Sequence, residues 1–233
     1  MNTLLIRLAG PMQSWGVQSR FEHRDTLTEP TKSGVVGILA SALGRRRDES
    51  VDDLSALRMG VRVDREGQMR KDYQTAQRWK KEKGSETLVA GTATLSPRYY
   101  LADARFLVGL ESIDRSFLES LDKALKAPKW PLFLGRKSFF PGEPVSTVDG
   151  IQECDLETAL SMYPWKAGNA QEVPQQLRMI VDAGSPITGN ENTKLIRPDH
   201  PVSFSERKFT LREVFVSYIP TPVDVEEVTD VSG

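Results

Sequence analysis

The sequence predicts an α+β protein built around a ferredoxin-like sheet, with a projecting β-hairpin and a smaller β-rich C-terminal part. The hydrophobic patterns of residues 1–126 follow the order strand, helix, strand, strand and helix, which begins a split βαβ arrangement with two helices on one face of the sheet. Residues 64–96 are cationic and too poor in apolar residues for a core, but their β-branched residues favour a long hairpin. Short strand-like segments continue after residue 144.

The first strand and the first helix enclose the most informative stretch. Leu4–Leu8 is short and aliphatic and is followed by Gly10-Pro11, as expected of a buried strand. A helix is predicted over Ser33–Leu43, with Ser33 as its N-cap and Gly44 as its C-terminal stop. Apolar residues cover most of the circumference of this helix, so we expect it to be buried.

The remaining elements follow from the same periodicities. Arg58–Val63 alternates apolar and polar residues, Tyr99–Leu110 contains a buried strand, and Arg115–Lys126 is an amphipathic helix capped by Asp114. Further strands are predicted over 145–151, 177–181 and 209–219, a short helix over 155–162 and a polar loop over 184–201.

We expect three parts of the chain from these elements. Residues 1–150 form the ferredoxin-like domain, including the hairpin of residues 64–96. Residues 151–219 supply strands and loops that pack on the same domain. Residues 220–233 are acidic and contain proline, so a disordered tail is expected there.

Composition excludes several classes of protein. The chain has 233 residues, of which 39% are hydrophobic, so it can bury a core. No apolar run approaches the ~20 residues of a membrane span and no signal segment precedes Arg7, so we expect a cytoplasmic protein without a membrane partner. One cysteine and two histidines leave no ligand set for zinc, and the glycine motifs of nucleotide-binding loops are absent. We therefore expect no metal and no cofactor.

Charge is distributed unevenly along the chain. Residues 1–137 contain 24 lysines and arginines against 17 acidic residues, whereas residues 138–233 contain 7 against 15. This asymmetry fits either a basic binding face or ordinary solvated charge. Arg45-Arg46-Arg47 follows the carboxyl end of the first helix, where cations complement the helix dipole, and we interpret it as structural.

Cations interleaved with aromatic residues favour single-stranded RNA as a ligand. Aromatic faces stack on unpaired bases while cations contact phosphates. Trp15, which precedes a glycine, is expected to be exposed for this purpose, with packing as the alternative for it and for each hairpin aromatic. The hairpin residues assigned to binding are Arg70, Lys71, Tyr73, Arg78 and Trp79.

Two further segments carry cations suited to an anion. Thr31-Lys32-Ser33-Gly34 places a lysine and hydroxyls at the start of a helix, where free N–H groups favour negative charge, although a plain N-cap explains the pattern too. Arg136-Lys137 follows Gly135 in a compact cationic tip suited to phosphate, with a solvated loop as the alternative.

Residues for catalysis are few. His23 could act as a base and, with Tyr73 or Lys32, could cut RNA without a metal. A single histidine in a polar loop is usually only a surface residue, so no catalytic residue is assigned. The neighbours of Cys154 include no basic residue that would lower the pKa of its thiol.

Three motifs resemble the CasD family, the fifth CRISPR-associated protein family in its type I-E form. They are Arg7–Gly16 (RLAGPMQSWG), Pro30–Leu39 (PTKSGVVGIL) and Phe133–Ser138 (FLGRKS), in this order and at similar spacing. The likeness is strong over the N-terminal part that contains these motifs and looser over the acidic remainder, as the divergence of peripheral loops permits.

The resemblance implies a non-catalytic subunit of Cascade, the RNA-guided surveillance complex of antiviral defence, with an RRM-like (RAMP) fold and a thumb hairpin at residues 64–96. Such a subunit holds the 5′ handle of the crRNA, contacts the adjacent backbone subunit and the large subunit, and meets target DNA only indirectly through the complex. By position, the residues expected at or near the handle are Met12, Gln13, Trp15, Lys32, Ser33, Gly34, Arg136 and Lys137.

Two other readings stay open. A relative in type I-C systems is the metal-independent endoribonuclease that processes the crRNA precursor, although the lysine-histidine pair associated with that activity has no counterpart here. An unrelated RRM-like protein that binds single-stranded mRNA is the third reading. Only the Cascade reading predicts co-purification with several Cas proteins and with crRNAs of uniform length.

Overall fold

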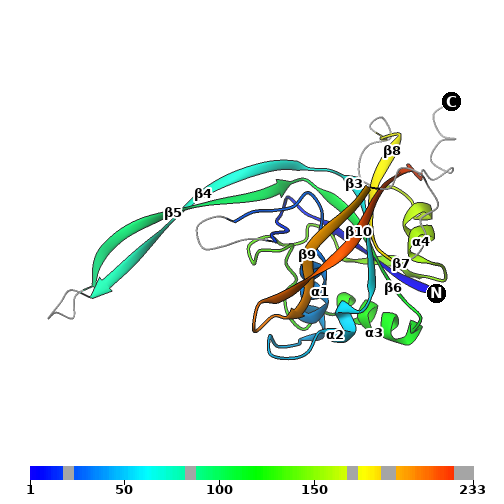
Figure 1. Ribbon diagram of the computed structural model, residues 1–233, viewed down its shortest axis with the longest axis horizontal. Helices are drawn as coiled ribbons and strands as arrows, with labels where there is room; N and C mark the ends of the chain where they lie inside the picture. Colours follow the sequence, from blue (N-terminus) through cyan, green and yellow to red (C-terminus); the bar gives the residue numbers. More distant parts are fainter. Residues whose placement is uncertain (18–23, 82–87, 167–172, 185–192, 223–233) are drawn as a thin grey trace.

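The computed structural model describes residues 1–17, 24–81, 88–166, 173–184 and 193–222. These residues form a body around a seven-stranded sheet, and a long two-stranded arm projects from it (Figure 1). Every strand pair of the large sheet is antiparallel, and helices are few. The predicted mixture of helices with a largely antiparallel sheet is therefore confirmed.

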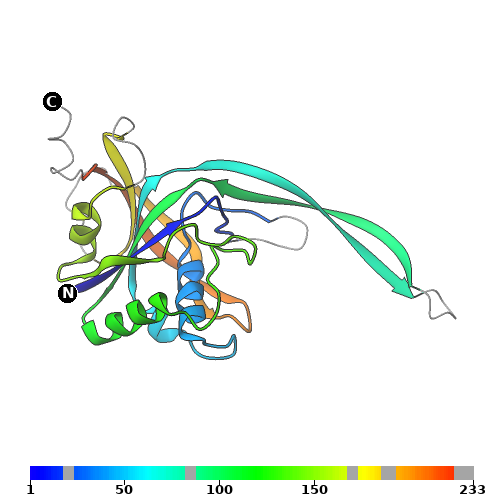
Figure 2. The same cartoon turned by 180° about the vertical axis from the view of Figure 1, so that it is seen from behind.

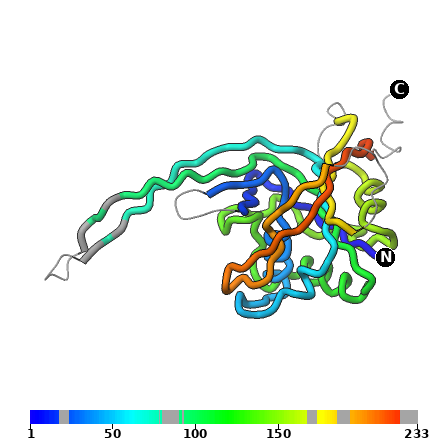
Figure 3. Tube along the Cα trace, viewed as in Figure 1, coloured from blue at the N-terminus to red at the C-terminus, as the bar shows by residue number. Residues whose placement is uncertain are grey.

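The large sheet has the strand order β7-β1-β6-β3-β8-β10-β9. The strands from the N-terminal part are β1 (Asn2–Ala9), β3 (Arg58–Arg65), β6 (Arg105–Ser112) and β7 (Ser146–Gln152). The strands β8 (Gln176–Asp182), β9 (Thr193–Ser203) and β10 (Lys208–Pro220) extend the same sheet beyond β3, as the yellow to red tube in Figure 3 shows.

Helices cover both faces of this sheet (Figure 2). The helices α1 (Lys32–Leu43), α2 (Asp52–Ser55) and α3 (Arg115–Lys126) share one hydrophobic core with Leu4, Ile6 and Leu8 of β1. The helix α4 (Leu156–Met162) packs with Leu5 on the other face. Because both faces are covered, β1 reads as a continuous apolar run rather than as an alternating one.

The caps of α1 are only partly as predicted. Gly44 ends the helix in the left-handed conformation (φ 73°), which a Cβ would strain. Ser33 is not the N-cap: the Thr31 hydroxyl accepts the hydrogen bond from the Gly34 N–H at 3.2 Å, and the helix begins at Lys32. The sequence holds two hydroxyl residues here, Thr31 and Ser33, with one residue between them, and local pattern alone does not choose between them.

The arm is a β-hairpin, as predicted, and we call it the thumb. Its strands are β4 (Gln68–Lys81) and β5 (Leu88–Ala102), and the short β2 (Met12–Gln13) pairs with the body end of β5. The hairpin strands lie between residues 68 and 102, whereas residues 64–96 were predicted: residues 64 and 65 belong to β3, and β5 continues to Ala102. The turn at 82–87 lies outside the described residues.

The polar loop predicted over 184–201 is wrong in its second half, which is the strand β9. Among the described strands it lies at the edge of the sheet with β10 as its only neighbour, so prolines and charges are tolerated in it. The predicted tail lies mostly outside the described residues, which end at residue 222. Within the described ranges, no helix is long and apolar enough to span a membrane.

Candidate nucleic-acid interface

The turn after β1 packs into the body, and the prediction that Trp15 is exposed is wrong. The Trp15 side chain is 1% exposed, and its Nε1 donates to Oε1 of Gln13 at 3.2 Å. Gln13 is fully buried and donates through Nε2 to the carbonyls of Leu8 and Ala104. A Cβ at Gly34 would lie 2.8 Å from the Trp15 ring, so the glycine of the second motif makes room for the tryptophan of the first.

Lys32 is also buried, in an ion network at the start of α1. Its Nζ lies 2.8 Å from the carboxylate of Asp182, and its backbone N–H donates to Asp199 at 2.8 Å. Arg212 pairs with both aspartates. Burial raises the pKa of Asp182, but the charges of Arg212 and Lys32 outweigh burial and hold this pKa below its usual value. The lysine predicted to attract an anion already has a carboxylate partner from β8.

Arg136, by contrast, lies in a groove at the base of the thumb. This thumb-base groove has a volume of about 160 Å³. Its lining residues are Met12, Lys71, Asp72, Gln74, Arg98, Tyr100, Arg136, Ser138 and Phe139. Three residues predicted from separate segments, Met12, Lys71 and Arg136, therefore meet at one place.

The turn before Arg136 is rigid. Gly135 has φ 91°, and a Cβ there would lie 1.7 Å from the Ser14 carbonyl oxygen, so only glycine fits. The Arg136 guanidinium donates to the Tyr99 carbonyl at 2.7 Å and lies 5.3 Å from the centre of the Phe139 ring. These contacts fix the cation at the mouth of the groove.

The thumb base holds more positive charge than its carboxylates balance. Burial, Arg98 and Arg24 lower the pKa of Arg136, in that order of importance, against a smaller opposite effect of Asp72 and Asp25. Arg98 has a buried Nε without a hydrogen-bond partner among the described residues. Phosphate oxygens, which accept hydrogen bonds and carry negative charge, would complete such a cluster.

Neither Arg24 nor Arg98 was selected as a binding residue from the sequence. Arg24 is held beside the thumb because its N–H donates to the Pro97 carbonyl at 3.1 Å and its own carbonyl accepts from the Tyr99 N–H at 2.8 Å. The hairpin register, which places Arg98 opposite Asp72, was the missing information. A hairpin prediction without a register does not say which cations face the body.

The thumb residues that were predicted lie along its exposed surface. Tyr73 is 59% and Trp79 62% exposed, and Lys71 Nζ lies 4.5 Å from the centre of the Tyr73 ring. Arg70 is exposed and donates to Gln68 at 2.5 Å. The backbone of Arg78 belongs to β4, but its side chain lies outside what the structure describes.

A second groove lies on the other side of the Gly135 turn, along α1. We call it the α1 groove; its volume is about 600 Å³. Ser33, Gly34 and Lys137 line it, together with Arg45, Arg46 and Arg47 and the aromatic rings of Trp130, Phe133 and Phe204. The predicted handle residues are therefore divided among two grooves and a buried support.

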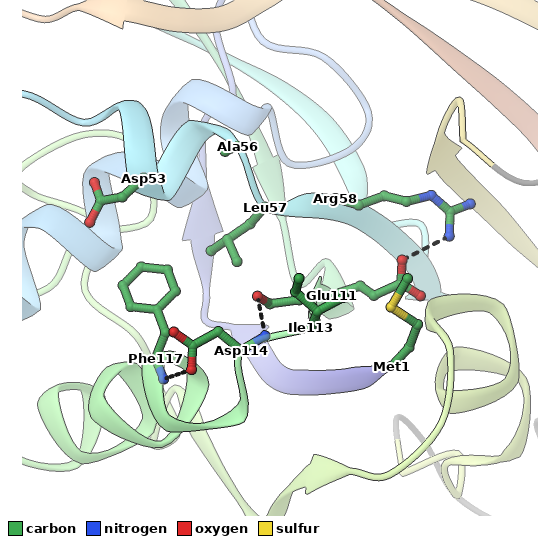
Figure 4. Close-up of a pocket in the computed structure, with 10 residues that line it drawn as sticks. Met1, Asp53, Ala56, Leu57, Arg58, Glu111, Ile113, Asp114 and Phe117 are labelled. Atoms are coloured by element: carbon green, nitrogen blue, oxygen red, sulfur yellow. Dashed lines mark hydrogen bonds and ion pairs between the residues drawn. The ribbon is translucent and has the colours of Figure 1, made fainter.

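A third hollow is lined by residues of α2, β3, β6 and α3 (Figure 4), and Met1, Leu57, Ile113 and Phe117 form its apolar surface. Its carboxylates already have partners: Glu111 pairs with Arg58, and Asp114 caps α3 through the Phe117 N–H. These groups do not form a cationic surface for nucleic acid.

The candidate catalytic residues do not form a site in the described structure. His23 lies outside the described residues. Burial and the neighbouring Asp155 raise the pKa of the Cys154 thiol, which makes it a poorer nucleophile. The described residues include no cluster of three histidine, cysteine or acidic side chains that could hold a metal.

Arginines and aromatic rings gather at the base of a ribbon that projects from an α+β body, an arrangement suited to single-stranded nucleic acid. Residues 3–215 match the family CRISPR-associated protein (Cas_Cas5), and the chain belongs to this family. The resemblance seen in the three sequence motifs is thereby confirmed.

Three relatives support this membership. The chain is 30% identical over 232 residues to the CRISPR system Cascade subunit CasD of Escherichia coli (strain K12), covering 91% of this chain and 94% of that protein. It is 45% identical to a Cas protein of known crystal structure, with a TM-score of 0.72 and coverage of 95% and 98%. It is 28% identical to a chain of a CRISPR RNA-guided surveillance complex, with a TM-score of 0.74 and coverage of 94% and 91%.

Proposed function

We propose that this chain is the subunit of a type I-E Cascade complex that holds the 5′ handle of the crRNA. The observation that carries the proposal is the cluster of Arg24, Arg98 and Arg136, whose positive charge exceeds that of its carboxylate neighbours at the base of the thumb. The similarity of the chain to the Cascade subunit CasD and to a chain of an RNA-guided surveillance complex supports the choice of RNA and of complex.

The sheet topology supports the RRM-like (RAMP) architecture that this function requires. The strands β1, β3, β6 and β7 stand in the order β7-β1-β6-β3, with α1 between the first two in sequence and α3 between the last two. This is the ferredoxin-like order of a split βαβ unit. In our proposal residues 1–150 form this unit with its thumb, and residues 151–219 extend the same domain.

The two kinds of group at the thumb base would divide recognition of the strand. The arginine forks would bind phosphates in two-point contacts. Tyr99 and Tyr100, half-buried on β5, and the exposed Tyr73 offer aromatic faces to unstacked bases. The exposed outer part of the thumb, with Trp79, would reach the adjacent backbone subunit, and the body would contact the large subunit in the cytoplasm.

We propose that the chain is not a nuclease, with processing of the crRNA precursor as the alternative. His200, the histidine among the described residues, is half-buried next to the ion network at the start of α1 rather than at the thumb base. Incubating the purified chain with a crRNA precursor tests this directly. Cleavage that disappears in His23→Ala would replace our proposal by the endoribonuclease.

Competition binding tests the proposed ligand. The crRNA that co-purifies with the complex is sequenced, and its 5′ end is synthesised together with a scrambled strand of the same length and composition. We expect the handle to compete for the purified chain at physiological salt at least tenfold better than the scrambled strand, because unstacked bases held in pockets give sequence preference. Equal competition by the two strands would contradict handle recognition.

A further inference from the structure

The triple arginine after α1 has a second feature that the helix dipole does not explain. Arg45 is engaged, with its guanidinium on both carboxylate oxygens of Asp53 at 2.5 Å. Arg46 and Arg47 are exposed. The Arg46 backbone N–H donates to the Glu49 carboxylate at 3.0 Å, and its guanidinium lies 3.4 Å from Asp48, a surface pair of little energetic weight. Arg45 therefore anchors the segment and leaves two cations at the rim of the α1 groove.

Aromatic rings form the walls of this groove. Trp130 is 44% exposed, and its backbone N–H donates to the Ser41 carbonyl at 3.2 Å, while the Lys129 N–H donates to that of Ala42 at 3.0 Å. These bonds satisfy the last carbonyls of α1 and hold the tryptophan in place. Phe133 and Phe204 lie on the same lining, so fixed aromatic faces are available to a ligand.

Small residues leave the floor of the groove open. Ser33, Gly37 and Ser41 follow one another at a spacing of four along α1, so they share one face of the helix. The helix has 12 residues and is about 18 Å long, long enough for more than one nucleotide of an extended strand. None of the described lining residues is a carboxylate, so the charge of the groove is positive.

The Gly135 turn joins this groove to the thumb base. Arg136 faces the thumb-base groove, whereas Gly135 and Lys137 line the α1 groove. Because close packing fixes the turn at Gly135, the consecutive cations Arg136 and Lys137 are held in two different grooves. A strand that runs from one groove into the other would meet cations for its phosphates in both.

We propose that the α1 groove is a second binding site for single-stranded RNA, which receives the nucleotides next to those at the thumb base, with Arg46, Arg47 and Lys137 on phosphates and Trp130 stacked on a base. The proposal rests on the proposed function, since it continues the same strand. Exposed aromatic rings beside cations are the means by which proteins bind single strands without reading a duplex. It goes further by assigning a role to Arg46, Arg47 and Trp130, which the resemblance did not select.

The test is a length series with the full chain. Fluorescein-labelled oligouridylates of 4, 8 and 16 nucleotides are bound at several salt concentrations, using the unmodified chain, Arg46→Ala with Arg47→Ala, and the control Lys123→Ala with Lys126→Ala on α3. We expect the control to match the unmodified chain. The arginine double variant should bind the 4-mer normally but bind the 16-mer with a salt slope flatter by about 1.4, two lost contacts at roughly 0.7 each.

Trp130→Ala gives a readout of stacking. We expect about a 5- to 150-fold loss of affinity for the 16-mer, with an unchanged salt slope and no loss for the 4-mer. A 16-mer that carries 4-thiouridine at either end should crosslink to a peptide that contains Trp130. Melting curves of each variant confirm folding.

Three outcomes would contradict the proposal in different ways. Unchanged affinity and slope of the arginine double variant for the 16-mer, with a 4-mer that still depends on Arg136, would overturn the α1 site alone. Failure of every oligonucleotide and of the handle to bind would overturn the proposed function as well. Unchanged RNA binding, together with loss of another Cascade protein from the complex, would assign the groove to a protein instead.

Discussion

Two clusters of cations in this protein differ in how fully nearby carboxylates balance their charge. At the start of α1, Lys32 is buried and the Arg212 side chain is 10% exposed, and Asp182 and Asp199 lie within hydrogen-bond distance of them. At the thumb base, Arg98 and Arg24 each disfavour the charge of Arg136, and Asp72 and Asp25 compensate only in part. The charges of the first, closed cluster are balanced within the protein, whereas the second, open cluster has positive charge left for an external anion.

The difference explains which predicted cation serves which purpose. A lysine at a helix N-terminus and an arginine after a glycine look alike in the sequence, and both were assigned to RNA. In the structure Lys32 is neutralised by a strand 150 residues away in the chain, while Arg136 faces a groove. We therefore expect charge balance, rather than residue type, to separate a structural cation from a binding one.

The largest expected effect concerns Trp15 in the buried turn after β1. Trp15→Ala removes a fully buried aromatic side chain and should lower the free energy of unfolding by about 3 to 5 kcal/mol. The same substitution at the exposed Trp79 is the matched control and should change stability by about 0.5 kcal/mol or less. Urea unfolding measures both. Equal losses at the two positions would contradict the burial assigned to Trp15.

Asp182→Ala tests the closed cluster and should follow in size. It leaves Lys32 and Arg212 with one carboxylate fewer in a buried place, at a cost of about 3 kcal/mol. The RNA salt slope of the folded protein should stay the same. Asp149→Ala, at an exposed carboxylate, is the control. A normal stability combined with an altered salt slope would reverse the comparison between the clusters.

Arg98→Ala with Arg136→Ala tests the open cluster. Loss of two phosphate contacts should flatten the slope of log K against log salt by about 1.4 for a single strand. Stability should change little, since these arginines repel each other and the Arg136 bond to the Tyr99 carbonyl is the main loss. If the double variant kept the original slope, the thumb base would not be a phosphate site.

The smallest expected effect is the acid dependence of the closed cluster. The pKa of Asp182 is lowered in the folded state, so its charge stabilises the fold above the ordinary value of 3.8, and this contribution is lost as the pH falls toward the lowered pKa. Asp182→Asn does not titrate, so its stability should fall less steeply over that range. Parallel curves for the two proteins, from denaturant unfolding at several pH values, would contradict a lowered pKa.

Patterns with a local cause were predictable from the sequence. The apolar run of β1, the helix stop at Gly44 and the amphipathic α3 depend on residues close in the chain, and the structure confirms them. The thumb was predictable because a segment with so few apolar residues has to leave the core. The family was predictable from three sequence motifs. The first two lie side by side in the structure, where Trp15 packs on Gly34.

Features that depend on distant partners were not predictable. The burial of Trp15 depends on α1, the role of Lys32 on Asp182, and the place of Arg98 on the register of the thumb. The strand β9 escaped prediction because Pro198 and Pro201 mark turns in most contexts but are tolerated at a sheet edge. In each case the missing fact was a neighbour far away in the sequence.

The pairing of the thumb has a consequence for hydrogen exchange. Away from β2 and from the bridge between Arg24 and Arg98, the strands β4 and β5 pair only with each other within the described residues, and a lone two-stranded ribbon is marginally stable in water. Its amide protons would therefore exchange through local opening, well before those of β1 and β6 in the centre of the body. Slow exchange along β4 would then report that a neighbour has covered the ribbon, which makes these amides an internal gauge of assembly.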